Sequence, residues 1–468
     1  MALSETAHST DDGIVSALSN KYAWLLAFAG VLLPNIPFLA LMVFACPKRS
    51  GAVVIYLLVA IASRKVPGWA TVAMLVAAVT IDTFMVIAGV FDLAPTLLLE
   101  SIRYAVAFDF FGSTAYLIAA SVLVATVAVT AWLLIHFRAQ MQSVSLLPAI
   151  FMAIAVLAAD IAVNTPSKNI DRLFGALYSS DIPFTSAMKK TGFEQSAVTD
   201  GHNLLLVVVE GMGAFDAPEH QALLTRLLET RDLEKRYSIT TGTSSYFGST
   251  TGAESRELCG SWGDFRDYLG KPHYNCLPAR MARAGYETSA FHAFTGNFFK
   301  RKAWYPHVGF EHRHFMEDLV ADGTDPDPSY CGLTFKGLCD GDVARRVRTY
   351  LDTPDGKPRF AYWLTLNTHM PIAPGSGTPR LSCDTDNPFA DHMVCDMTEM
   401  WMDVMNDIAA IAGDPDLPPT DIVIVGDHTP PMWTRNGRNA FTPGKVAWYA
   451  LKARATRQVA HTTAASRP

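Results

Sequence analysis

The chain contains 468 residues, of which 50% are hydrophobic and 18% are charged, and its formal net charge is −6. This composition excludes a disordered protein, and the length exceeds that of one small domain. A net negative charge without a basic patch also excludes a nucleic-acid-binding protein. Residues 1–165 contain only 15 charged side chains, whereas residues 166–468 contain 67. The sequence therefore predicts a membrane segment followed by a water-soluble domain rather than a soluble cytoplasmic enzyme.

Long apolar runs in the first third predict an α-helical membrane anchor. Four runs, at about 22–46, 67–91, 113–137 and 145–163, approach the ~20 residues that cross a bilayer core. A shorter run at 52–62, bounded by basic pairs, can also cross if its flanks reach the interface. We therefore expect about five spans within residues 1–163, then a polar connector at 164–200, a soluble domain at 201–455 and a tail at 456–468.

The polar residues of the anchor carry further expectations. Asp82 lies inside the third span, and such an acid is either functional or a buried carboxyl bonded to a neighbouring helix; we expect the second. Residues 93–110 are amphipathic and are expected at the outer interface. Basic residues do not decide the orientation, because an N-terminus inside the cell places four of them on that side and three opposite. The four are Lys21, Arg64, Lys65 and Arg138, and the three are Lys48, Arg49 and Arg103.

Six of the seven cysteines lie in the soluble part, and their even number predicts disulfides in an oxidising compartment. Six cysteines allow fifteen pairings, of which three short-range pairs are the natural ones. The sequence contains no CxxC pair and no cysteine and histidine cluster at zinc-finger spacing. We therefore expect an extracytoplasmic domain with three disulfides, joining Cys259 to Cys276, Cys331 to Cys339, and Cys383 to Cys395.

The soluble part alternates apolar strands with helical patterns, which predicts an α/β fold with a largely parallel sheet flanked by helices. Four buried strands are expected, at 203–209, 287–291, 360–366 and 421–425. Acids and histidines follow these strands closely, at the edge where ligands bind in open α/β sheets, namely Glu210, His292, His369, Asp427 and His428. Glu210, Asp427 and His428 form a ligand set suited to one divalent metal, Zn²⁺ or Mn²⁺. The alternative is that these residues only cap strands and form turns.

A hydroxyl-rich loop at 241–260 offers a fourth ligand and a nucleophile. Thr251 and Glu254 fit a Thr-x-x-Glu capping box, which predicts that a short helix begins here. Thr250 then precedes the N-cap, and a metal bound to its hydroxyl would lower the pKa of that hydroxyl and make it a nucleophile. The pattern also fits two threonines that serve only as caps, and local chemistry does not choose between Thr250 and Thr251.

At these motifs the chain resembles the membrane-anchored phosphotransferases of the alkaline phosphatase and sulfatase superfamily, which include lipoteichoic acid synthase and the phosphoethanolamine transferases. The resemblance covers the anchor and nearly all of residues 200–450. It rests on NLLLVVVEGMG at 203–213, GSTTGAE at 248–254, FH at 291–292, NTHMP at 367–371 and VGDH at 425–428. Five spans followed by an extracytoplasmic sulfatase-like domain match the architecture of this family.

The resemblance implies a role for each matching residue. Four residues correspond to metal ligands, namely Glu210, Thr250, Asp427 and His428. Four correspond to substrate-binding positions, namely His292, Phe299, Arg301 and His369. Thr250 corresponds to the nucleophile, and Phe299 stands where the synthase has tryptophan. The chain departs from the family at Gly211, where serine is usual, and after His428, where Thr-Pro replaces the Gly-Glu of many phosphoethanolamine transferases.

A second motif, from Cys276 to Arg280, fits the C-x-P-x-R pattern of sulfatases, in which the cysteine becomes formylglycine. The sequence lacks the Thr-Gly that sulfatases carry afterwards, and Cys276 completes an even set of six cysteines. The run resembles instead the Leu-Pro helix that the transferases carry before Gly-Tyr-x-Thr. We therefore interpret the motif as structural.

The resemblance implies a metal-dependent transferase that moves a phospholipid head group, phosphoethanolamine or phosphoglycerol, to an extracytoplasmic acceptor hydroxyl through a phosphothreonine. The donor is a membrane phospholipid and the acceptor is a glycan or a lipid, with no nucleic acid involved and a monomeric protein expected. The implied location is the inner membrane, with several spans and the catalytic domain in the periplasm. Two alternatives remain: a sulfatase or phosphodiesterase with water as the acceptor, and a membrane sensor without activity.

Overall fold

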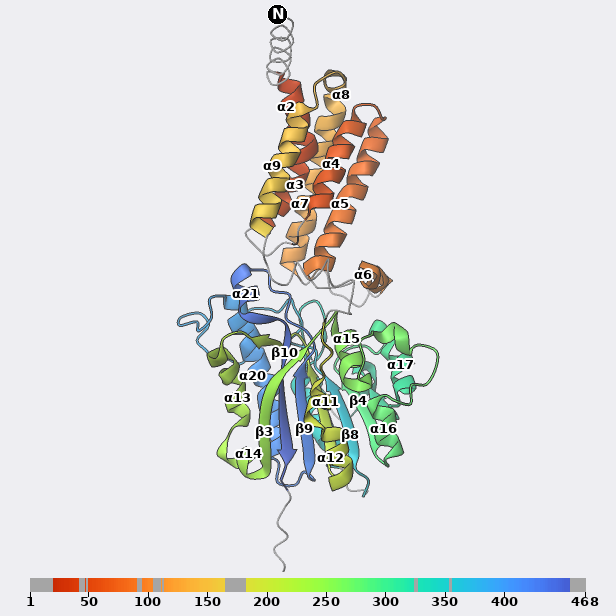
Figure 1. Ribbon diagram of the computed structural model, residues 1–468, viewed down its shortest axis with the longest axis vertical. Coiled ribbons are helices and arrows are strands. Elements are labelled where there is room, and N and C mark those ends of the chain that lie inside the picture. The colour runs from red at the N-terminus through yellow and green to blue at the C-terminus, as the bar shows by residue number, and fades with distance from the viewer. Residues whose placement is uncertain are drawn as a thin grey trace, which may run out of the picture.

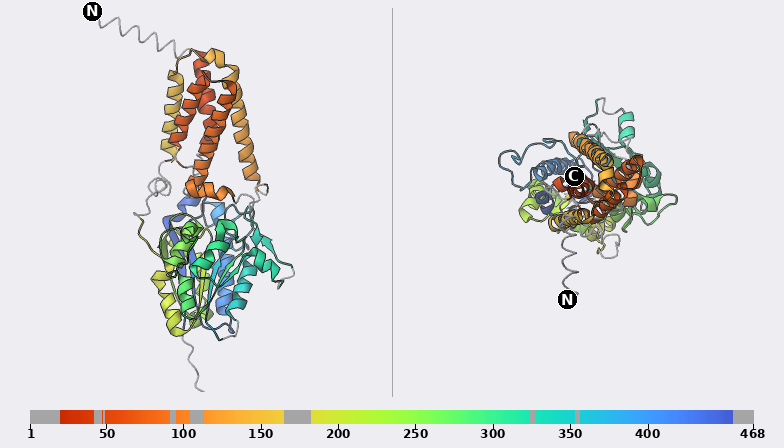
Figure 2. Two further views of the ribbon diagram at one scale, coloured as in Figure 1. Left: turned by 90° about the vertical axis from the view of Figure 1, so that its right-hand side faces the viewer. Right: turned by 90° about the horizontal axis from the view of Figure 1, so that it is seen from above.

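The computed structural model consists of a bundle of apolar helices and an α/β domain, which follow one another along the long axis (Figure 1). The described residues are 20–41, 47, 49–90, 95–103, 111, 113–164, 182–323, 327–352 and 356–454. Helix α6 (Pro95–Ser101) lies at the junction between the two parts, as both side views show (Figures 1 and 2). Leu99 and Ile102 are exposed there. The predicted amphipathic stretch also includes 93–94 and 104–110, which lie outside the described residues.

The bundle contains, besides α6, the elements α2 (Lys21–Ala27), η1 (Phe28–Leu32), α3 (Leu33–Ala40), α4 (Ser50–Ser63), α5 (Gly68–Val90), α7 (Thr114–His136), α8 (Arg138–Met141) and α9 (Leu147–Asn164). Three described stretches are long and apolar enough to cross a membrane, judged by length and composition: Lys21–Ala40, α5 and α7. Helices α4 and α9 are apolar but shorter. Among the described residues, three candidate spans are therefore supported where the sequence suggests about five, because α4 and α9 fall below the ~20 residues of a full span.

A buried polar cluster lies inside the bundle. The guanidinium of Arg49 donates to Asp82 through Nε at 2.9 Å and through Nη2, and Nη2 also donates to Asn35 Oδ1 at 3.0 Å. Tyr56 donates its hydroxyl to Asp82 Oδ2 at 2.9 Å, and the backbone N–H of Arg49 donates to Asp160 at 2.9 Å. Asp82 is thus a buried carboxyl bonded to a neighbouring helix, as expected.

Arg49 itself departs from the expectation. Its side chain is only 3% exposed, so it does not lie in solvent on the outer side as the count of flanking charges assumed. A buried charge in an apolar bundle is retained when it is paired and hydrogen-bonded, and Asp82 provides that pairing. Arg49 therefore contributes to helix packing. It is not one of the solvent-exposed basic residues that were compared between the two sides of the membrane.

The α/β domain is built on a sheet of eight strands in the order β2-β10-β9-β1-β8-β4-β5, with β3 paired to β10. The strands are β1 (Asn203–Val209), β2 (Gly213–Phe215), β3 (Tyr237–Ser245), β4 (Glu287–His292), β5 (His312–His314), β8 (Arg359–Leu364), β9 (Thr420–Gly426) and β10 (Phe441–Ala453), and β6 (Tyr330–Cys331) and β7 (Gly337–Leu338) form a separate ribbon. The central strands β9, β1, β8 and β4 are parallel neighbours, and they are the four strands expected from the sequence. The largely parallel sheet is therefore confirmed.

Helices cover both faces of this sheet (Figures 1 and 2). They are α11 (Ala187–Thr191), α12 (Phe193–Asp200), α13 (Pro218–Leu228), α14 (Arg231–Arg236), α15 (Thr250–Glu254), η5 (Ser255–Cys259), η6 (Phe265–Tyr268), α16 (Leu277–Arg283), η7 (Phe298–Lys300), α17 (Arg301–Val308), α18 (Met316–Ala321), α19 (Asp340–Leu351), α20 (His392–Gly413) and α21 (Arg435–Asn439). Every residue of β1 is buried, as expected of a parallel strand covered on both faces. Phe193 and Ala197 of α12 are also buried, against β1 and β9, so the described end of the predicted connector packs on the α/β domain.

The three disulfides join Cys259 to Cys276, Cys331 to Cys339, and Cys383 to Cys395. These are the short-range pairs expected from the sequence. The pairs close loops with sequence separations of 17, 8 and 12 residues. A bridge over a ~15-residue loop contributes roughly 3 kcal/mol in the chain-entropy view, so the three together are expected to matter for a domain of this size.

Thiol counting on the denatured, unreduced protein should find one free thiol, that of Cys46. The three observed bridges consume the other six cysteines, and they persist only in an oxidising compartment. Reduction before denaturation should lower the midpoint of thermal unfolding. Seven free thiols in protein isolated under thiol-trapping conditions would contradict both the bridges and an extracytoplasmic domain.

Candidate active site

The parallel order of the central strands brings the predicted site residues to one edge of the sheet. Glu210 follows β1, His292 is the last residue of β4, and Asp427 follows β9. Because β9, β1, β8 and β4 are adjacent and parallel, their carboxyl ends meet. This edge is where open α/β sheets bind ligands.

Glu210, Asp427 and His428 form a compact cluster. His428 Nε2 lies 3.2 Å from Glu210 Oε1 and 3.3 Å from Asp427 Oδ2. One ligand atom from each residue lies within 4.8 Å of the other two. The structure therefore places the three predicted ligands together, at a separation that one ion can span.

Thr250 completes this cluster. It is the first residue of α15, and its Oγ1 donates to Glu210 Oε2 at 3.1 Å. The neighbouring Thr251 is fully buried, and its hydroxyl has no hydrogen-bond partner among the described residues. Of the two threonines, Thr250 is the one that bonds to the carboxylate of the cluster, so the geometry favours Thr250 over Thr251.

The predicted capping box is wrong. The N-cap of α15 is Ser249, no side-chain capping bond forms there, and Thr250 is inside the helix rather than before the N-cap. The carboxylate of Glu254 turns instead to Arg301, whose Nη2 donates to it at 3.0 Å. A buried arginine attracts a carboxylate more strongly than a backbone N–H does, which explains the different partner.

Arg301 is held rigidly but keeps one donor available. Its side chain is 2% exposed and pairs with Glu254, which also accepts hydrogen bonds from Tyr305 and Tyr362. Its Nη1 has no hydrogen-bond partner within the described part of the chain. A buried, unsatisfied guanidinium nitrogen is costly unless a ligand completes it. An anionic substrate group is the natural partner.

Phe299 lies just before Arg301 in a strained part of the backbone. Phe299 and Lys300 have φ values of +50° and +53°, which residues with a side chain rarely adopt. The Phe299 ring is buried against Phe265, and its centroid lies 5.6 Å from the guanidinium carbon of Arg301. The structure thus places Phe299 beside the predicted phosphate-binding arginine, as packing for that side chain.

The two predicted substrate histidines lie on the same edge as neutral bases. His292 Nδ1 lies 3.0 Å from the carbonyl of Leu364, and His369 Nδ1 lies 2.6 Å from that of Met370. These carbonyls accept the Nδ1 proton and leave Nε2 as the basic nitrogen. Burial, with the nearby charge of Arg301, lowers the pKa of His292 to about 3, and burial lowers the pKa of His369. His369 Nε2 lies 3.7 Å from Glu210 Oε1.

The surroundings shift the pKa values of the two carboxyl groups of the cluster in opposite directions. Burial opposes ionisation of Glu210, but the nearby imidazoles of His369 and His428 outweigh it and lower the pKa of Glu210. Burial and the charge of Glu210 raise the pKa of Asp427. Burial opposes the charge on His428, yet the two carboxylates prevail and raise the pKa of His428 to about 10. The two carboxylates therefore favour a positive charge beside them.

The residues present fit one divalent metal. Asp427 Oδ1 accepts two backbone N–H groups, from Gly211 and His428, both at 2.7 Å. Its buried Oδ2 accepts no hydrogen bond among the described residues and faces the imidazole of His428. Two carboxylates, one imidazole and the Thr250 hydroxyl are a donor set for Zn²⁺ or Mn²⁺. A second group with metal-ligand spacing includes Cys383, whose sulfur is in a disulfide and offers no thiolate.

Three groups that the sequence analysis did not single out hold Glu210 in place. The Glu210 N–H donates to Thr365 Oγ1 at 3.0 Å, and its carbonyl accepts from Thr368 at 2.6 Å and from Trp401 Nε1 at 3.4 Å. The two threonines lie within the run after β8 that also contains His369. The threonines that follow β8 could therefore have been recognised from the sequence, because they lie next to His369. Nothing in the local sequence indicates Trp401.

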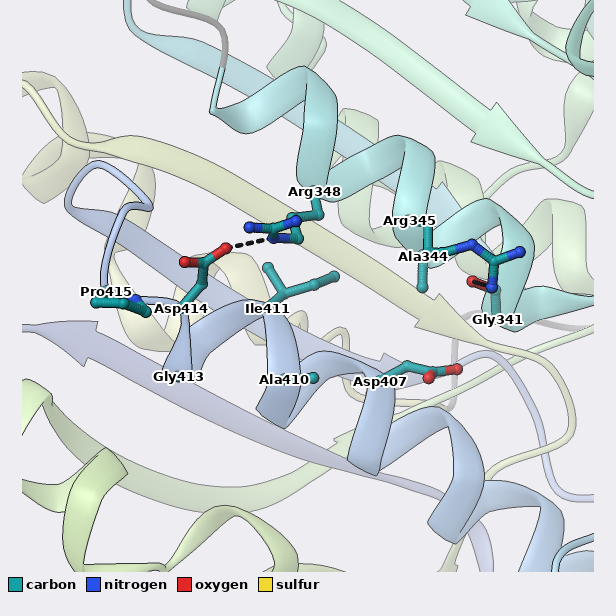
Figure 3. Close-up of a pocket in the computed structure, with 10 residues that line it drawn as sticks. All are labelled: Gly341, Ala344, Arg345, Arg348, Asp407, Ala410, Ile411, Gly413, Asp414 and Pro415. Atoms are coloured by element: carbon teal, nitrogen blue, oxygen red, sulfur yellow. Dashed lines mark hydrogen bonds and ion pairs between the residues drawn. The ribbon is translucent and has the colours of Figure 1, made fainter. Parts of the chain in front are cut away.

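A groove of about 710 Å³ opens elsewhere, between α19 and α20 (Figure 3). Arg348 and Asp414 form an ion pair across it, and Arg345 and Asp407 lie at its other end. None of the predicted site residues is among those that line it. The chemistry of the strand ends is therefore separate from this groove.

Residues 202–450 match the sulfatase family model. The match spans more than half of the chain and includes the strand ends, the Thr250 helix and the ligand cluster. The chain therefore belongs to the sulfatase family. Comparison with curated protein sequences gives no significant match.

Several solved structures are similar to part of this chain. The lipoteichoic acid synthase LtaP of Listeria monocytogenes is 15% identical, with a TM-score of 0.40, over 55% of this chain and 66% of that one. The phosphoglycerol transferase GacH of Streptococcus pyogenes is 13% identical, with a TM-score of 0.38, over 58% of this chain and 76% of that one. The periplasmic domain of EptC from Escherichia coli, in complex with zinc, is 17% identical, with a TM-score of 0.35, over 54% and 73%. This chain thus spans just under two thirds of the listerial synthase.

The sulfatase-like motif at Cys276 is not part of the ligand cluster. Cys276 is the N-cap residue of α16, and its sulfur is bonded to Cys259. A cysteine in a disulfide is not available for conversion to formylglycine. The interpretation of this motif as structural agrees with the observed bridge.

Replacing Glu210, Asp427 or His428 individually by Ala should weaken binding of Zn²⁺ and Mn²⁺ and leave less than one metal per chain. Each replacement removes one ligand and leaves the others with uncompensated charge in a buried cleft, so some stability should also be lost. Metal analysis of the purified variants and a thermal melt test both points. Full metal occupancy in all three variants would contradict the assignment.

Metal affinity should rise with pH. The carboxylates keep His428 protonated at neutral pH, because they raise its pKa to about 10, whereas a metal needs the neutral imidazole. Because metal binding displaces one proton, the metal affinity should rise about tenfold for each unit of pH below that pKa. Titration with Mn²⁺ between pH 6 and 8 measures the slope, and a dissociation constant independent of pH would contradict the protonated cluster.

Proposed function

We propose that the protein transfers a phospholipid head group, phosphoethanolamine or phosphoglycerol, to an acceptor hydroxyl outside the cytoplasm. The contact between the Thr250 hydroxyl and Glu210, within the metal-ligand cluster, carries this proposal. The contact brings the hydroxyl of the first residue of α15 to the three clustered side chains, which supports a nucleophilic role for Thr250. The family membership and the available nitrogen of Arg301 add support.

A bound divalent metal would supply the positive charge that makes the Thr250 hydroxyl more acidic. In the first step the Thr250 oxygen forms a bond to phosphorus, and the bond from phosphorus to the diacylglycerol oxygen breaks. The hydroxyl proton passes to the leaving oxygen through the basic Nε2 of His292 or His369. The products are a phosphothreonine that carries the head group and a diacylglycerol.

In the second step the acceptor hydroxyl attacks the phosphorus and the bond to Thr250 breaks. The same histidines take the acceptor proton and return one to Thr250. Negative charge grows on the non-bridging oxygens in both steps, where Arg301 Nη1 and the first N–H groups of α15 can stabilise it. Glu254 fixes the orientation of Arg301 and leaves that nitrogen free for the phosphate.

The membrane anchor fits a lipid donor. We infer an inner-membrane protein of about five spans, in which α4 and α9 cross with the help of their flanking residues. The three disulfides support a periplasmic location for the catalytic domain. A monomer is sufficient, because one chain contributes all of the proposed ligands and the nucleophile.

Hydrolysis is the second candidate, because membership of the sulfatase family is equally compatible with it. A phosphodiesterase would use the same ligands and nucleophile, with water in place of the acceptor in the second step. The disulfide at Cys276 speaks against a sulfatase that depends on formylglycine. The acceptor distinguishes the two enzymes: the transferase uses the hydroxyl of a glycan or a lipid, and the phosphodiesterase uses water.

Thr250→Val should abolish transfer, by roughly a thousandfold or more, because it removes the nucleophilic oxygen and keeps the shape of the side chain. Metal binding should be weakened but retained, since three ligands remain. Incubation with mixed phospholipids, followed by mass spectrometry of the Thr250 peptide, should show a mass increase equal to the transferred head group in the unaltered protein only.

Thr251→Val is the matched control, because Thr251 is the adjacent threonine of the same helix and does not contact Glu210. It should keep most of the activity. Loss of activity in the Thr251 variant with retention in the Thr250 variant would show that the wrong threonine was chosen. Release of free head group without any acceptor product would favour the phosphodiesterase.

A further inference from the structure

A buried ion pair lies directly behind the ligand cluster. Arg256 Nε donates to Glu257 Oε1 at 2.6 Å, and both side chains are entirely buried. Both residues belong to η5, which continues without a break from α15 and therefore from Thr250. Neither residue contacts substrate in the proposed reaction, so the pair needs another explanation.

The remaining nitrogens of Arg256 bind the backbone that carries two of the proposed metal ligands. Its Nη2 donates to the carbonyl of Gly426 at 2.7 Å, and its Nη1 donates to the carbonyl of Asp427 at 3.3 Å. Nη1 also donates to the carbonyl of Ser245, the last residue of β3, at 3.3 Å. One guanidinium thus joins the helix of the nucleophile to the ends of β9 and β3.

Geometry explains why an arginine stands here. A guanidinium presents several N–H donors in a rigid plane, so it can bind the two consecutive carbonyls and a carboxylate at once. Lysine has the same charge but offers a single nitrogen. Burying an ion pair contributes little net stability, so orientation is the better account of its presence.

Glu257 connects this clamp to the juxtamembrane segment (residues 182–191), the first described residues after α9. Its carboxylate accepts from Ser186 Oγ at 2.8 Å, from the Met188 N–H at 3.0 Å and from the Ala187 N–H at 3.2 Å. These three groups form the beginning of α11. The side chain that orients Arg256 is therefore itself oriented by the segment that arrives from the membrane.

Three further hydrogen bonds attach the juxtamembrane segment to the same region. Lys190 Nζ donates to the carbonyl of Thr243 at 2.6 Å, and the Ser245 N–H donates to Thr185 Oγ1 at 2.6 Å. Lys189 Nζ donates to the carbonyl of Gly260, just after η5, at 2.8 Å. The segment therefore binds both β3 and the end of the element that carries Thr250.

We propose that Arg256 and Glu257 are positioning residues, which hold the Asp427-His428 backbone against the Thr250 helix and connect the metal site to the juxtamembrane segment. The inference extends the proposed function, because it assumes that Asp427, His428 and Thr250 form the reacting site. It differs from a structural role alone in one consequence: loss of the clamp changes metal affinity and turnover, and not only stability.

The test uses the full-length protein in detergent, with Arg256→Met, Arg256→Lys and Glu257→Gln. The matched control is Arg359→Met, because Arg359 is also a buried arginine paired with a glutamate, at the amino end of β8 and so at the opposite edge of the sheet. For each variant the dissociation constant of Zn²⁺ and Mn²⁺, the midpoint of thermal unfolding, and kcat and KM are measured.

Arg256→Met should weaken metal binding by about tenfold to a hundredfold, the range usual for groups that orient ligands. Turnover should fall with little change in KM, because the lipid contacts remain. Arg256→Lys should recover only part of the loss, and Glu257→Gln should show a smaller effect in the same direction. Arg359→Met should lower the thermal midpoint and leave metal affinity unchanged.

Metal affinity and kcat in Arg256→Met within about twofold of those in Arg359→Met would overturn the proposal, because the clamp would then be structural only. If Arg256→Met does not fold, the same comparison is made with Arg256→Lys and Glu257→Gln. Metal affinity does not depend on which reaction is catalysed. A protein that lacks head-group transfer but loses metal affinity with Arg256 would refute the proposed function and support the clamp.

Discussion

The site depends on one buried carboxylate, that of Glu210, which meets groups from separate parts of the chain. One of its oxygens accepts from Thr250, and the other lies near the imidazoles of His369 and His428. A carboxylate this buried is stable only where cations and donors replace its lost hydration. Because β1 is central in the sheet, Thr250, Asp427, His428 and His369 all come close to its carboxyl end.

Two buried ion pairs orient the element that carries Thr250. Glu254 pairs with Arg301 and keeps that arginine directed with one nitrogen available to an anion. Glu257 pairs with Arg256, which binds the backbone at the end of β9. In the proposed reaction the first pair serves the phosphate and the second serves the metal ligands. Glu254, Arg256 and Glu257 all lie within seven residues of Thr250, so a short stretch of chain contributes to both pairs.

The membrane anchor also contains a buried ion pair, between Arg49 and Asp82. Arg49 and Asp82 are both buried among apolar helices, where each would be unstable without the other. Their contact joins the N-terminus of α4 to α5, and Asn35 and Asp160 extend it to α3 and α9. The bundle is therefore held by polar contacts as well as by packing. Such an anchor would suit the proposed enzyme, whose donor is a membrane lipid.

The sequence by itself determined the apolar helices of the first third, the four central strands, the disulfide pairs and the acids and histidines at the strand ends. These follow from hydropathy, from strand patterns and from short separations, all of which are local properties of the chain. Only the tertiary structure decided that Thr250 faces Glu210, that Glu254 binds Arg301 rather than caps its helix, and that Arg49 lies inside the bundle. The partners in these contacts are 40, 47 and 33 residues apart. A buried charged group pairs with the partner that the fold brings closest, so the residues next to it in the sequence do not predict that partner.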